Sequence, residues 1–352
     1  MPECDVLVIG AGPAGSTAAR VAAAAGASVL IVDRKQTVGL PVQCAEHLPY
    51  RLAHDFGLNP GSEIVVQPVS SMRTHLPDGT SQSTPAPGVI CHRDRFDELL
   101  LGLARQAGAR FRAATAAVAF RKGTVTLRGA DGDSELAPAV VIGCDGPRSA
   151  VRRWLGFKDN ECVRARQELL PLAADLDETQ IFFRSYIPGG YGWLFPKRGL
   201  ANVGAGVDPR FGMSSGRALA GLKQELLSSG LIASRASAAV TGGLIPVGGQ
   251  TRVRAGNVIL AGDAAGQTHP LTGAGVPSAV FAGELAGMAA AGAAAGDTGA
   301  LAGYEEECEL FIGQSWRLAV KYRQEMADLW SGGPAALSRA VRSNWFAFKE
   351  SA

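Results

Sequence analysis

The hydrophobic positions at the start of the chain follow a strand, a glycine-rich turn, a helix and a second strand. Residues 5–9 (DVLVI) form a short apolar run, which GAGPAG and the Ala-rich stretch STAARVAAAAGA follow. A second apolar run, SVLIVD, ends on Asp33. Short apolar runs separated by a glycine turn and a helix are typical of parallel strands, so this order predicts a β-turn-α-β unit.

The middle of the chain changes from helical to strand-like periodicity. Residues 93–107 place apolar side chains at helical spacing, and Gly108 provides a C-terminal stop. Residues 122–141 predict a hairpin around ADGD that leads into the strand AVVIG. From about residue 160 to 250 the pattern alternates like β structure, in TQIFFRS, YGWLFP and LANVGAG.

The last third of the chain returns to a strand and then to helices. Residues 257–261 (NVILA) predict a buried strand, and the Ala/Gly-rich stretch after residue 276 predicts a helix. Residues 301–349 predict two or three amphipathic helices. Because no linker or repeat separates these patterns, we predict an α/β protein with interleaved domains. The first domain comprises 1–160 and 251–300, the β-sheet domain comprises 161–250 with part of 62–92, and the C-terminal helices comprise 301–352.

Composition narrows the class of protein. The 352 residues are enough for two domains, and 47% hydrophobic with 19% charged residues is typical of a soluble globular protein. A net charge of +2 lacks the basic footprint of a nucleic-acid-binding protein. The six cysteines form no C-x-x-C and no close Cys/His cluster, so we expect no metal site and no redox pair.

The same features bear on localisation. The chain enters a strand within its first five residues, so we expect no signal peptide. No uninterrupted apolar run reaches the ~18 residues that a membrane-spanning helix needs. We therefore expect a cytoplasmic protein, and a peripheral contact with a membrane surface stays open.

The first motif is VIGAGPAG, which predicts a nucleotide site. Gly10 permits the tight turn after the strand, Gly12 allows a pyrophosphate to approach the backbone, and Gly15 allows the helix to pack closely on the strand. The helix N-terminus then offers its positive dipole end to phosphates. Asp33, at the end of the second strand, can bond both hydroxyls of a ribose.

Two later motifs repeat a strand end followed by an aspartate beside glycine. In VVIGCDGPRSAVRR the pair is Asp145 and Gly146, and a plain Asp-Gly turn is the alternative interpretation. In NVILAGDAAGQTHPLTGAGV, Asp263 can accept a ribityl hydroxyl. The backbone N–H groups of the turn at 273–275 can face an electron-rich ring edge.

Together these stretches resemble the three signatures of the p-hydroxybenzoate-hydroxylase-type FAD fold. Arg93, before the helix RFDELL, resembles the arginine that this superfamily places against FAD. The resemblance implies a Rossmann-like FAD-binding domain interleaved with an antiparallel substrate domain. The cofactor-binding residues that it implies, with the residues beside the flavin, are Gly10, Gly12, Ala14, Gly15, Asp33, Arg34, Cys44, Ala45, Arg93, Asp145, Gly146, Gly262, Asp263, Pro270, Gly273, Ala274 and Gly275.

Two further stretches are similar to the geranylgeranyl reductase family. They are VGLPVQCAE at 38–46 and YGWLFP followed by seven residues and GAG at 191–206. In that family the aromatic motif lines the cavity where an isoprenoid chain meets the flavin, which implies that the substrate-binding residues are Tyr191, Trp193, Phe195 and Pro196. The cysteine-bearing segment implies that Cys44, Ala45 and Glu46 lie beside the isoalloxazine.

Strand geometry gives the aromatic motif a physical meaning. In a β-strand, residues 191, 193 and 195 share one face and form a continuous apolar surface. Such a surface can hold an extended apolar substrate, with Trp N–H and Tyr O–H available for a polar contact. The alternative is that the same side chains pack against a helix. Cys44 is likewise either a small buried residue or a residue beside the flavin, where Cys44 or an ordered water is the candidate proton donor.

The resemblance implies hydride transfer from reduced FAD to a C=C bond of an apolar prenyl-type substrate, with Cys44, Tyr191 and Trp193 as candidate catalytic residues. The sequence has no second glycine fingerprint for binding a nicotinamide nucleotide. We therefore expect the electron donor to be NAD(P)H that binds transiently or a small redox protein. Two alternatives stay open: an FAD-dependent monooxygenase (hydroxylase or halogenase), and a flavoprotein that transfers electrons or shields a ligand. The helices 316–330 and 337–350 mix basic and aromatic residues, so they either pack inside the protein or contact a membrane or partner.

Overall fold

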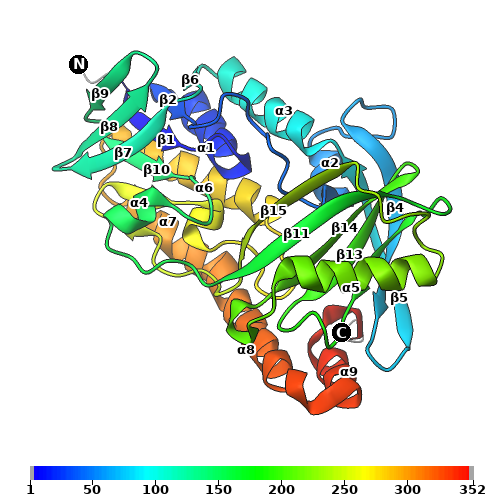
Figure 1. Cartoon of the computed structure of the whole chain (residues 1–352). Helices are drawn as coiled ribbons and strands as arrows, with labels where there is room; N and C mark the ends of the chain where they lie inside the picture. The colour runs from blue at the N-terminus through cyan, green and yellow to red at the C-terminus, as the bar shows by residue number, and fades with distance from the viewer. Residues whose placement is uncertain (1–3, 349–352) are drawn as a thin grey trace. The chain divides into compact units, whose positions relative to one another are not determined.

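The computed structural model describes residues 4–348, which divide into two compact units (Figure 1). Unit 1 runs to residue 40 and includes residues 94–161 and 246–319. Unit 2 contains residues 41–93, 162–245 and the chain from 320 onward. The units are therefore interleaved along the sequence. Residues 41–61, predicted in the first domain, cluster with unit 2, and so does the whole of 62–92, of which a part was predicted in the β-sheet domain.

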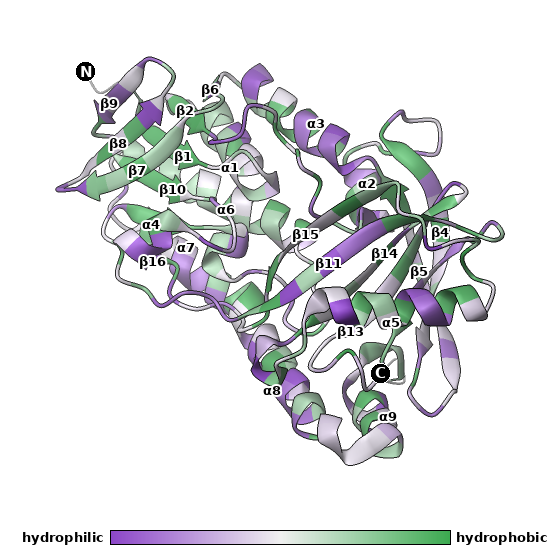
Figure 2. Cartoon of the chain, in the orientation of Figure 1, coloured by the Kyte–Doolittle hydropathy of each residue, from purple (hydrophilic) through white to green (hydrophobic). Residues whose placement is uncertain are grey.

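Unit 1 is built on a mainly parallel sheet of strand order β16-β17-β10-β1-β2-β6. Its central strands β1, β2 and β10 are buried along their whole length and uniformly hydrophobic, as expected for a sheet covered on both faces (Figure 2). The hairpin predicted around ADGD belongs to a separate antiparallel sheet of β7, β8 and β9. The strands are β1 Val6–Ile9, β2 Val29–Val32, β6 Arg110–Arg112, β7 Ala116–Arg121, β8 Thr124–Gly129, β9 Gly132–Leu136, β10 Val140–Gly143, β16 Arg254–Ala255 and β17 Val258–Leu260.

Glycines allow the two central helices of unit 1 to pack closely. A Cβ at Gly283 or Gly287 of α6 would overlap the backbone of Ala14 or Ala18 in α1. Among the described residues, α6 is the one helix long and apolar enough to cross a membrane, and 56% of its 18-residue window is buried in the protein. The helices of this unit are α1 Pro13–Ala24, α3 Arg93–Gln106, α4 Ala150–Trp154, η2 Gly262–Ala265, α6 Val276–Ala294, α7 Ala300–Cys308 and η3 Glu309–Gly313.

Unit 2 is built on a sheet of strand order β15-β11-β14-β13-β12-β4-β5-β3. Helix α5 crosses one face of this sheet (Figure 1), and Leu219, Leu222 and Leu226 of the helix share a core with Leu194 and Val203 of the strands. The strands are β3 His47–Pro49, β4 Val65–His75, β5 Ser81–Cys91, β11 Cys162–Pro171, β12 Glu178–Phe182, β13 Tyr191–Lys197, β14 Leu200–Val207 and β15 Ala239–Pro246. Its helices before the C-terminal segment are α2 Tyr50–Asp55, η1 Pro209–Phe211 and α5 Ser215–Ser228.

The C-terminal helices bury their three tryptophans. Trp316, Trp330 and Trp345 are each at most 7% exposed. The guanidinium of Arg323 is also buried and pairs with Asp208 at 2.7 Å. The elements are α8 Gln314–Asp328, η4 Trp330–Gly332, α9 Gly333–Asn344 and η5 Phe346–Phe348, and residues 349–352 of the predicted helical region lie outside the described residues. These contacts favour the packing interpretation for most of the two aromatic segments.

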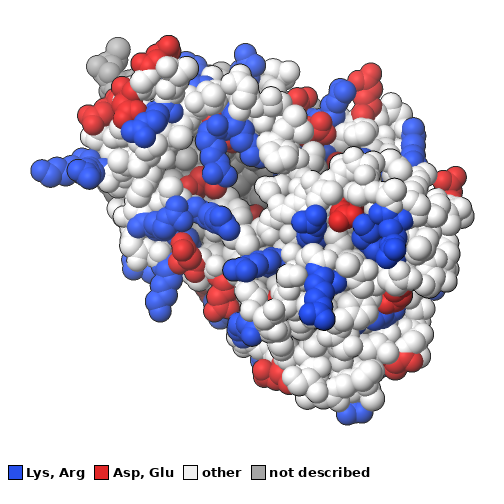
Figure 3. All heavy atoms as spheres, viewed as in Figure 1, with Lys and Arg blue, Asp and Glu red and all other residues white. Residues whose placement is uncertain are grey.

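The surface carries mixed charge. On the part of unit 2 around α5, Figure 3 shows Lys and Arg side chains beside Asp and Glu rather than a continuous basic field. An ion pair that is mostly buried joins Lys223 of α5 to Glu168 of β11 at 2.5 Å.

The close packing of α1 and α6 gives a stability prediction. Gly287→Val should lower the free energy of unfolding by about 2–3 kcal/mol, because the new side chain must displace the α1 backbone. Gly303→Ala is the matched control: a Cβ there meets nothing within 4 Å, so it should raise stability by about 0.5–1 kcal/mol. Urea unfolding followed by circular dichroism measures both. Equal stability of the Gly287 variant and the wild type would contradict the proposed contact.

Candidate functional site

The glycine loop before α1 has the geometry of a phosphate site. Gly10 has φ +104°, and a Cβ on Gly10 or Gly15 would overlap neighbouring backbone. Gly12 differs, because a Cβ there would meet nothing within 4 Å. Gly12 is also the N-cap of α1, and no side chain caps the helix. The first and third glycines therefore serve packing, while the second leaves the N-terminus of α1 open to an anion. Ala14, in the first turn of α1, is buried.

Asp33 is fixed at the end of β2 by the same loop. Its carboxylate accepts the backbone N–H of Ala11 and that of Lys35, each at 2.8 Å. Each carboxylate oxygen keeps a further lone pair, so the group can also accept ribose hydroxyls. The neighbouring Arg34 side chain is exposed.

Asp145 has a buried oxygen that fits a hydrogen-bond donor from a ligand. Its Oδ2 accepts the N–H of Ala150 at 2.6 Å, whereas its Oδ1 is buried with no partner among the described residues. Burial raises the pKa of this carboxyl group. Gly146 follows with φ +83°, which turns the chain toward α4. An orphaned buried acceptor carries a free-energy cost that a bound hydroxyl group would remove.

Asp263 and the loop before α6 form the third part of the candidate cofactor site. Gly262, with φ +65°, places Asp263 in η2, where the carboxylate accepts the hydroxyl of Thr268 at 2.6 Å. The His269 ring accepts the backbone N–H groups of residues 271 and 272 through Nδ1, which makes it a structural part of this loop. The loop then passes through buried Pro270, Gly273 at φ +67°, exposed Ala274 and Gly275, the N-cap of α6.

The aromatic motif lies on β13, on the sheet face opposite α5. Leu194 is in the core shared with α5, so the alternating residues Tyr191, Trp193 and Phe195 point to the other face. Pro196 alternates with them and therefore lies on the α5 side. The alternative in which the aromatic residues pack against the covering helix does not apply to α5. We call the side of the sheet that carries Tyr191, Trp193 and Phe195 the aromatic face.

The first glycine of the GAG sequence leaves space for the tryptophan of the aromatic motif. Trp193 pairs directly with Gly204 on β14, and a Cβ at Gly204 would overlap the indole. The indole thus lies across the bare backbone of the neighbouring strand. Gly206, opposite Tyr191, has only ordinary contacts, the nearest at 3.6 Å. The spacing between the tryptophan and the first glycine is set by strand register.

The segment that carries Cys44 lies against the aromatic face of the same unit. The amide of Gln167 on β11 donates to the Cys44 carbonyl at 3.0 Å, and Gln167 accepts the indole N–H of Trp193 at 2.8 Å. The amide of Asn202 on β14 donates to the Ala45 carbonyl at 3.2 Å. The Cys44 sulfur accepts the N–H of Glu46 at 3.2 Å, and the side chain of Cys44 is half-buried.

Glu46 connects this segment to three other elements. Its carboxylate, 3% exposed, accepts Lys197 Nζ at 2.5 Å, Asn202 Nδ2 at 2.8 Å and the backbone N–H of Arg93 at 3.2 Å. Its backbone has φ +69°, a left-handed conformation that is rare for glutamate. Its carbonyl accepts the N–H of Cys91 at 2.9 Å. The surrounding bonds hold a strained conformation in place, which is typical of functional segments.

His47 and Phe195 form an edge contact beside this segment, with ring centroids 5.9 Å apart. Burial lowers the pKa of His47 to about 4, so its imidazole is uncharged at neutral pH. Its Nε2 is buried with no hydrogen-bond partner among the described residues. A Cβ at Gly88 would crowd this nitrogen, so the glycine makes room for the ring.

At the other end of β13, Tyr191 belongs to an aromatic cluster. Its ring lies 5.7 Å from that of Trp345 and 6.0 Å from that of Phe183, between centroids. Trp345 donates its indole N–H to Thr74 at 3.2 Å. Burial raises the pKa of the Tyr191 phenol. The C-terminal segment therefore covers the Tyr191 end of the aromatic face.

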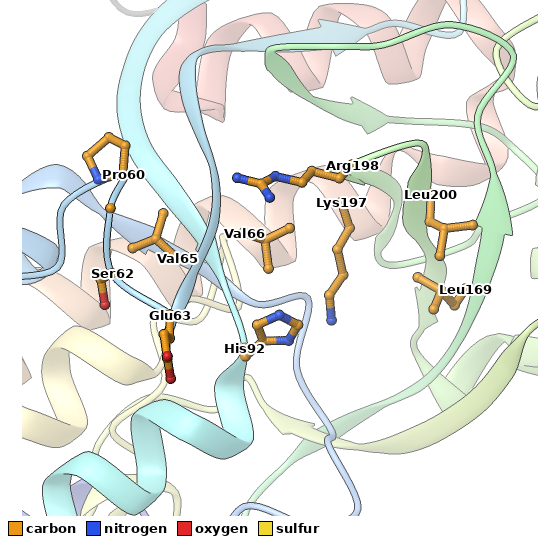
Figure 4. Close-up of a pocket in the computed structure, with 11 residues that line it drawn as sticks. Pro60, Ser62, Glu63, Val65, Val66, His92, Leu169, Lys197, Arg198 and Leu200 are labelled. Atoms are coloured by element: carbon orange, nitrogen blue, oxygen red, sulfur yellow. The ribbon is translucent and has the colours of Figure 1, made fainter.

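A pocket of about 640 Å³ in unit 2 opens at the Lys197 end of β13 (Figure 4). In Figure 4 the side chains of Lys197, His92 and Val66 reach into it from three segments. Its lining combines apolar and charged side chains: Pro60, Gly61, Ser62, Glu63, Val65, Val66, His92, Leu169, Lys197, Arg198 and Leu200.

Comparison with known proteins identifies the family of this chain. An FAD binding domain model matches residues 3–179, and a geranylgeranyl reductase catalytic domain model matches residues 160–228. Digeranylgeranylglycerophospholipid reductase 2 of Methanopyrus kandleri is 34% identical, over 96% of this chain and 90% of the relative. The corresponding reductase of Methanothrix thermoacetophila is 35% identical, over 89% and 84%. The chain belongs to the geranylgeranyl reductase family.

Solved structures agree on the fold. A geranylgeranyl bacteriochlorophyll reductase-like protein of Thermoplasma acidophilum superposes with a TM-score of 0.83 at 24% identity, covering 97% of this chain and 96% of its own. Aklavinone-11 hydroxylase, solved with FAD and aklavinone, has a TM-score of 0.71 at 23% identity, over 94% of this chain and 71% of its own. As a member of the geranylgeranyl reductase family, the protein is an FAD-dependent oxidoreductase. The predicted fold class, cofactor and enzyme class are confirmed.

Two residues of the candidate site were not predicted from the sequence. Gln167 and Asn202 came from stretches interpreted only as β structure, yet their amides hold the Cys44 segment. The signal was a polar residue within a buried strand, since Asn202 is the one polar residue in LANVGAG and is 4% exposed. Such a residue needs a hydrogen-bond partner, but the sequence does not say which one.

The contact between Trp193 and Gly204 gives a matched pair of variants. Gly204→Ala should displace the indole and lower the free energy of unfolding by about 1–3 kcal/mol, because the new methyl group overlaps the ring. Gly206→Ala should be close to neutral, because its Cβ would make ordinary contacts. Urea unfolding and near-ultraviolet circular dichroism of tryptophan are the measurements. If both variants behave alike, Gly204 is not required for the indole position.

Proposed function

We propose that the protein reduces a carbon–carbon double bond of an apolar, prenyl-type lipid. The observation that carries the proposal is the position of the Cys44 segment on the aromatic face of unit 2, held there by Gln167 and Asn202. Alkene reduction requires a hydride donor and a proton donor, and in this proposal the Cys44 thiol supplies the proton while the aromatic face holds the apolar chain. The relatives cited above, named as reductases of digeranylgeranylglycerophospholipid, support this substrate class.

Each component has a separate part in the reaction. The chemistry that FAD supplies when bound is transfer of a hydride to one carbon of the double bond. The residues implied for FAD by the family motifs are those of unit 1 together with Arg93, and the open N-terminus of α1 and the orphaned Asp145 oxygen support binding there. Cys44 then gives a proton to the neighbouring carbon, so that hydride plus proton saturates the alkene. The proposal includes a position beside the flavin for Cys44 and Ala45.

The aromatic face suits a hydrocarbon rather than a polar ligand. The indole N–H of Trp193 is already bonded to Gln167, so this ring offers the substrate only apolar surface. Trp193 and Phe195 therefore hold the chain by contact area, which favours an apolar substrate of extended shape. Tyr191 lies at the end covered by Trp345 and would limit how far the chain extends. The electrons come from NAD(P)H or a small redox protein.

An anaerobic single-turnover experiment tests this function. The purified FAD-loaded protein is reduced with dithionite, excess reductant is removed, and a geranylgeranyl lipid is added without oxygen. We expect recovery of the oxidised flavin spectrum and one saturated double bond per flavin by mass spectrometry. No reoxidation by the lipid, with oxygen-dependent formation of a hydroxylated or halogenated product instead, would overturn the proposal in favour of a monooxygenase.

The same assay tests the thiol. Cys44→Ser should retain the flavin spectrum and slow alkene reduction by at least 10-fold, because a serine hydroxyl is a much weaker acid than a thiol. Cys162→Ser, at another half-buried cysteine of unit 2, is the control and should keep the wild-type rate. An unchanged rate in the Cys44 variant would remove this residue from the mechanism.

Access to a lipid substrate suggests a peripheral membrane contact through the C-terminal helices. Leu329 and Phe346 are 46% and 44% exposed there. The double variant Leu329→Ser and Phe346→Ser should lose flotation with phospholipid vesicles, whereas Val240→Ser, at a residue 54% exposed on β15, should not. Absence of flotation in the wild-type protein would reject this contact.

A further inference from the structure

The backbone around Cys44 is held by side chains from the neighbouring sheet rather than by its own secondary structure. Cys44 and Ala45 precede β3, which begins at His47. Their two carbonyls accept amide N–H groups from Gln167 and Asn202, at 3.0 and 3.2 Å. Both amides are buried, at 7% and 4% exposure, so water does not compete freely for these bonds.

Trp193 determines which way the Gln167 amide faces. An indole N–H is a donor only, so Gln167 must turn its oxygen toward Trp193, at 2.8 Å. Its NH2 group is then directed to the Cys44 carbonyl. A ring without an N–H at position 193 would remove this constraint on the orientation of the amide.

Asn202 fixes the next residue in the same way. Its single NH2 group donates to the Ala45 carbonyl and to the Glu46 carboxylate, at 3.2 and 2.8 Å. Glu46 in turn donates its backbone N–H to the Cys44 sulfur at 3.2 Å. The thiol is thus oriented by one direct hydrogen bond and by two bonds to the carbonyls of residues 44 and 45.

We infer that Trp193, Gln167 and Asn202 are positioning residues, which set the location of the Cys44 thiol through its main chain. This inference rests on the proposed function for the use of the thiol in catalysis. It also assigns Trp193 a second task besides apolar contact, because its N–H orients Gln167. The sheet thus holds the thiol segment in place, and removing the hydrogen bonds of any of the three residues frees the thiol to move.

Thiol reactivity tests the inference without depending on turnover. Gln167→Met keeps the side-chain length and removes both hydrogen bonds. We expect iodoacetamide to alkylate Cys44 at least threefold faster in this variant, as measured on the Cys44 peptide by mass spectrometry in the FAD-loaded protein. Gln167→Asn, too short to reach both partners, should change the rate in the same direction and serves as the second variant should the first misfold.

Gln67→Met is the matched control. Gln67 also donates to a carbonyl, of Leu176 at 2.8 Å, and accepts a backbone N–H, of Arg198 at 2.7 Å, but makes neither bond to the Cys44 segment. The rate of Cys44 alkylation in the Gln67→Met variant should equal that of the wild type. An equal acceleration in the Gln67 and Gln167 variants, or no acceleration in the Gln167 variants, would overturn the inference.

The role of Trp193 is tested by a double-mutant cycle. Trp193→Phe should accelerate Cys44 alkylation, and combining it with Gln167→Met should add no more than twofold, because both changes break the same connection. Multiplication of the two separate effects would show that Trp193 does not act through Gln167.

In alkene reduction, Gln167→Met should lower kcat at least fivefold with KM within twofold. If the wild type reduces no alkene, the proposed function fails while the alkylation result still decides the positioning role.

Discussion

The organisation of unit 2 depends on the buried carboxylate of Glu46. A charge that is 3% exposed is costly unless it is paired and fully hydrogen-bonded, and Lys197, Asn202 and the backbone of Arg93 provide those bonds. These partners come from β13, β14 and the start of α3. Removing any one would leave a buried charge short of a partner, so the carboxylate fixes the Cys44 segment to the sheet.

In both units, glycines allow two neighbouring elements to pack closely. In unit 1, Gly283 and Gly287 let α6 approach α1, whose N-terminus no side chain caps. In unit 2, Gly204 lets the Trp193 indole lie across β14. In each case a methyl group would force apart two elements that form the site. The glycines therefore act by permitting close approach, and only some of them by adopting a positive φ.

The contacts of Trp193 change the meaning of the aromatic motif. Its spacing alone is typical of a surface that binds an apolar chain, and membership of the geranylgeranyl reductase family agrees with that. The structure adds a hydrogen-bonded connection from the indole through Gln167 to the Cys44 carbonyl. One residue thus links the apolar surface to the position of the thiol.

The sequence determined the class of fold, the FAD cofactor and the family, because each depends on local patterns. The strand-turn-helix around Gly10, the aspartates beside glycine and the two family-specific stretches are readable without knowing any long-range contact. The sequence could not determine that residues 41–61 belong with the sheet of unit 2. It also could not pair Trp193 with Gly204, or Gln167 and Asn202 with the segment after residue 43. Those contacts join residues 11 to 157 positions apart, and strand register and chain crossing, which no local pattern encodes, bring them together.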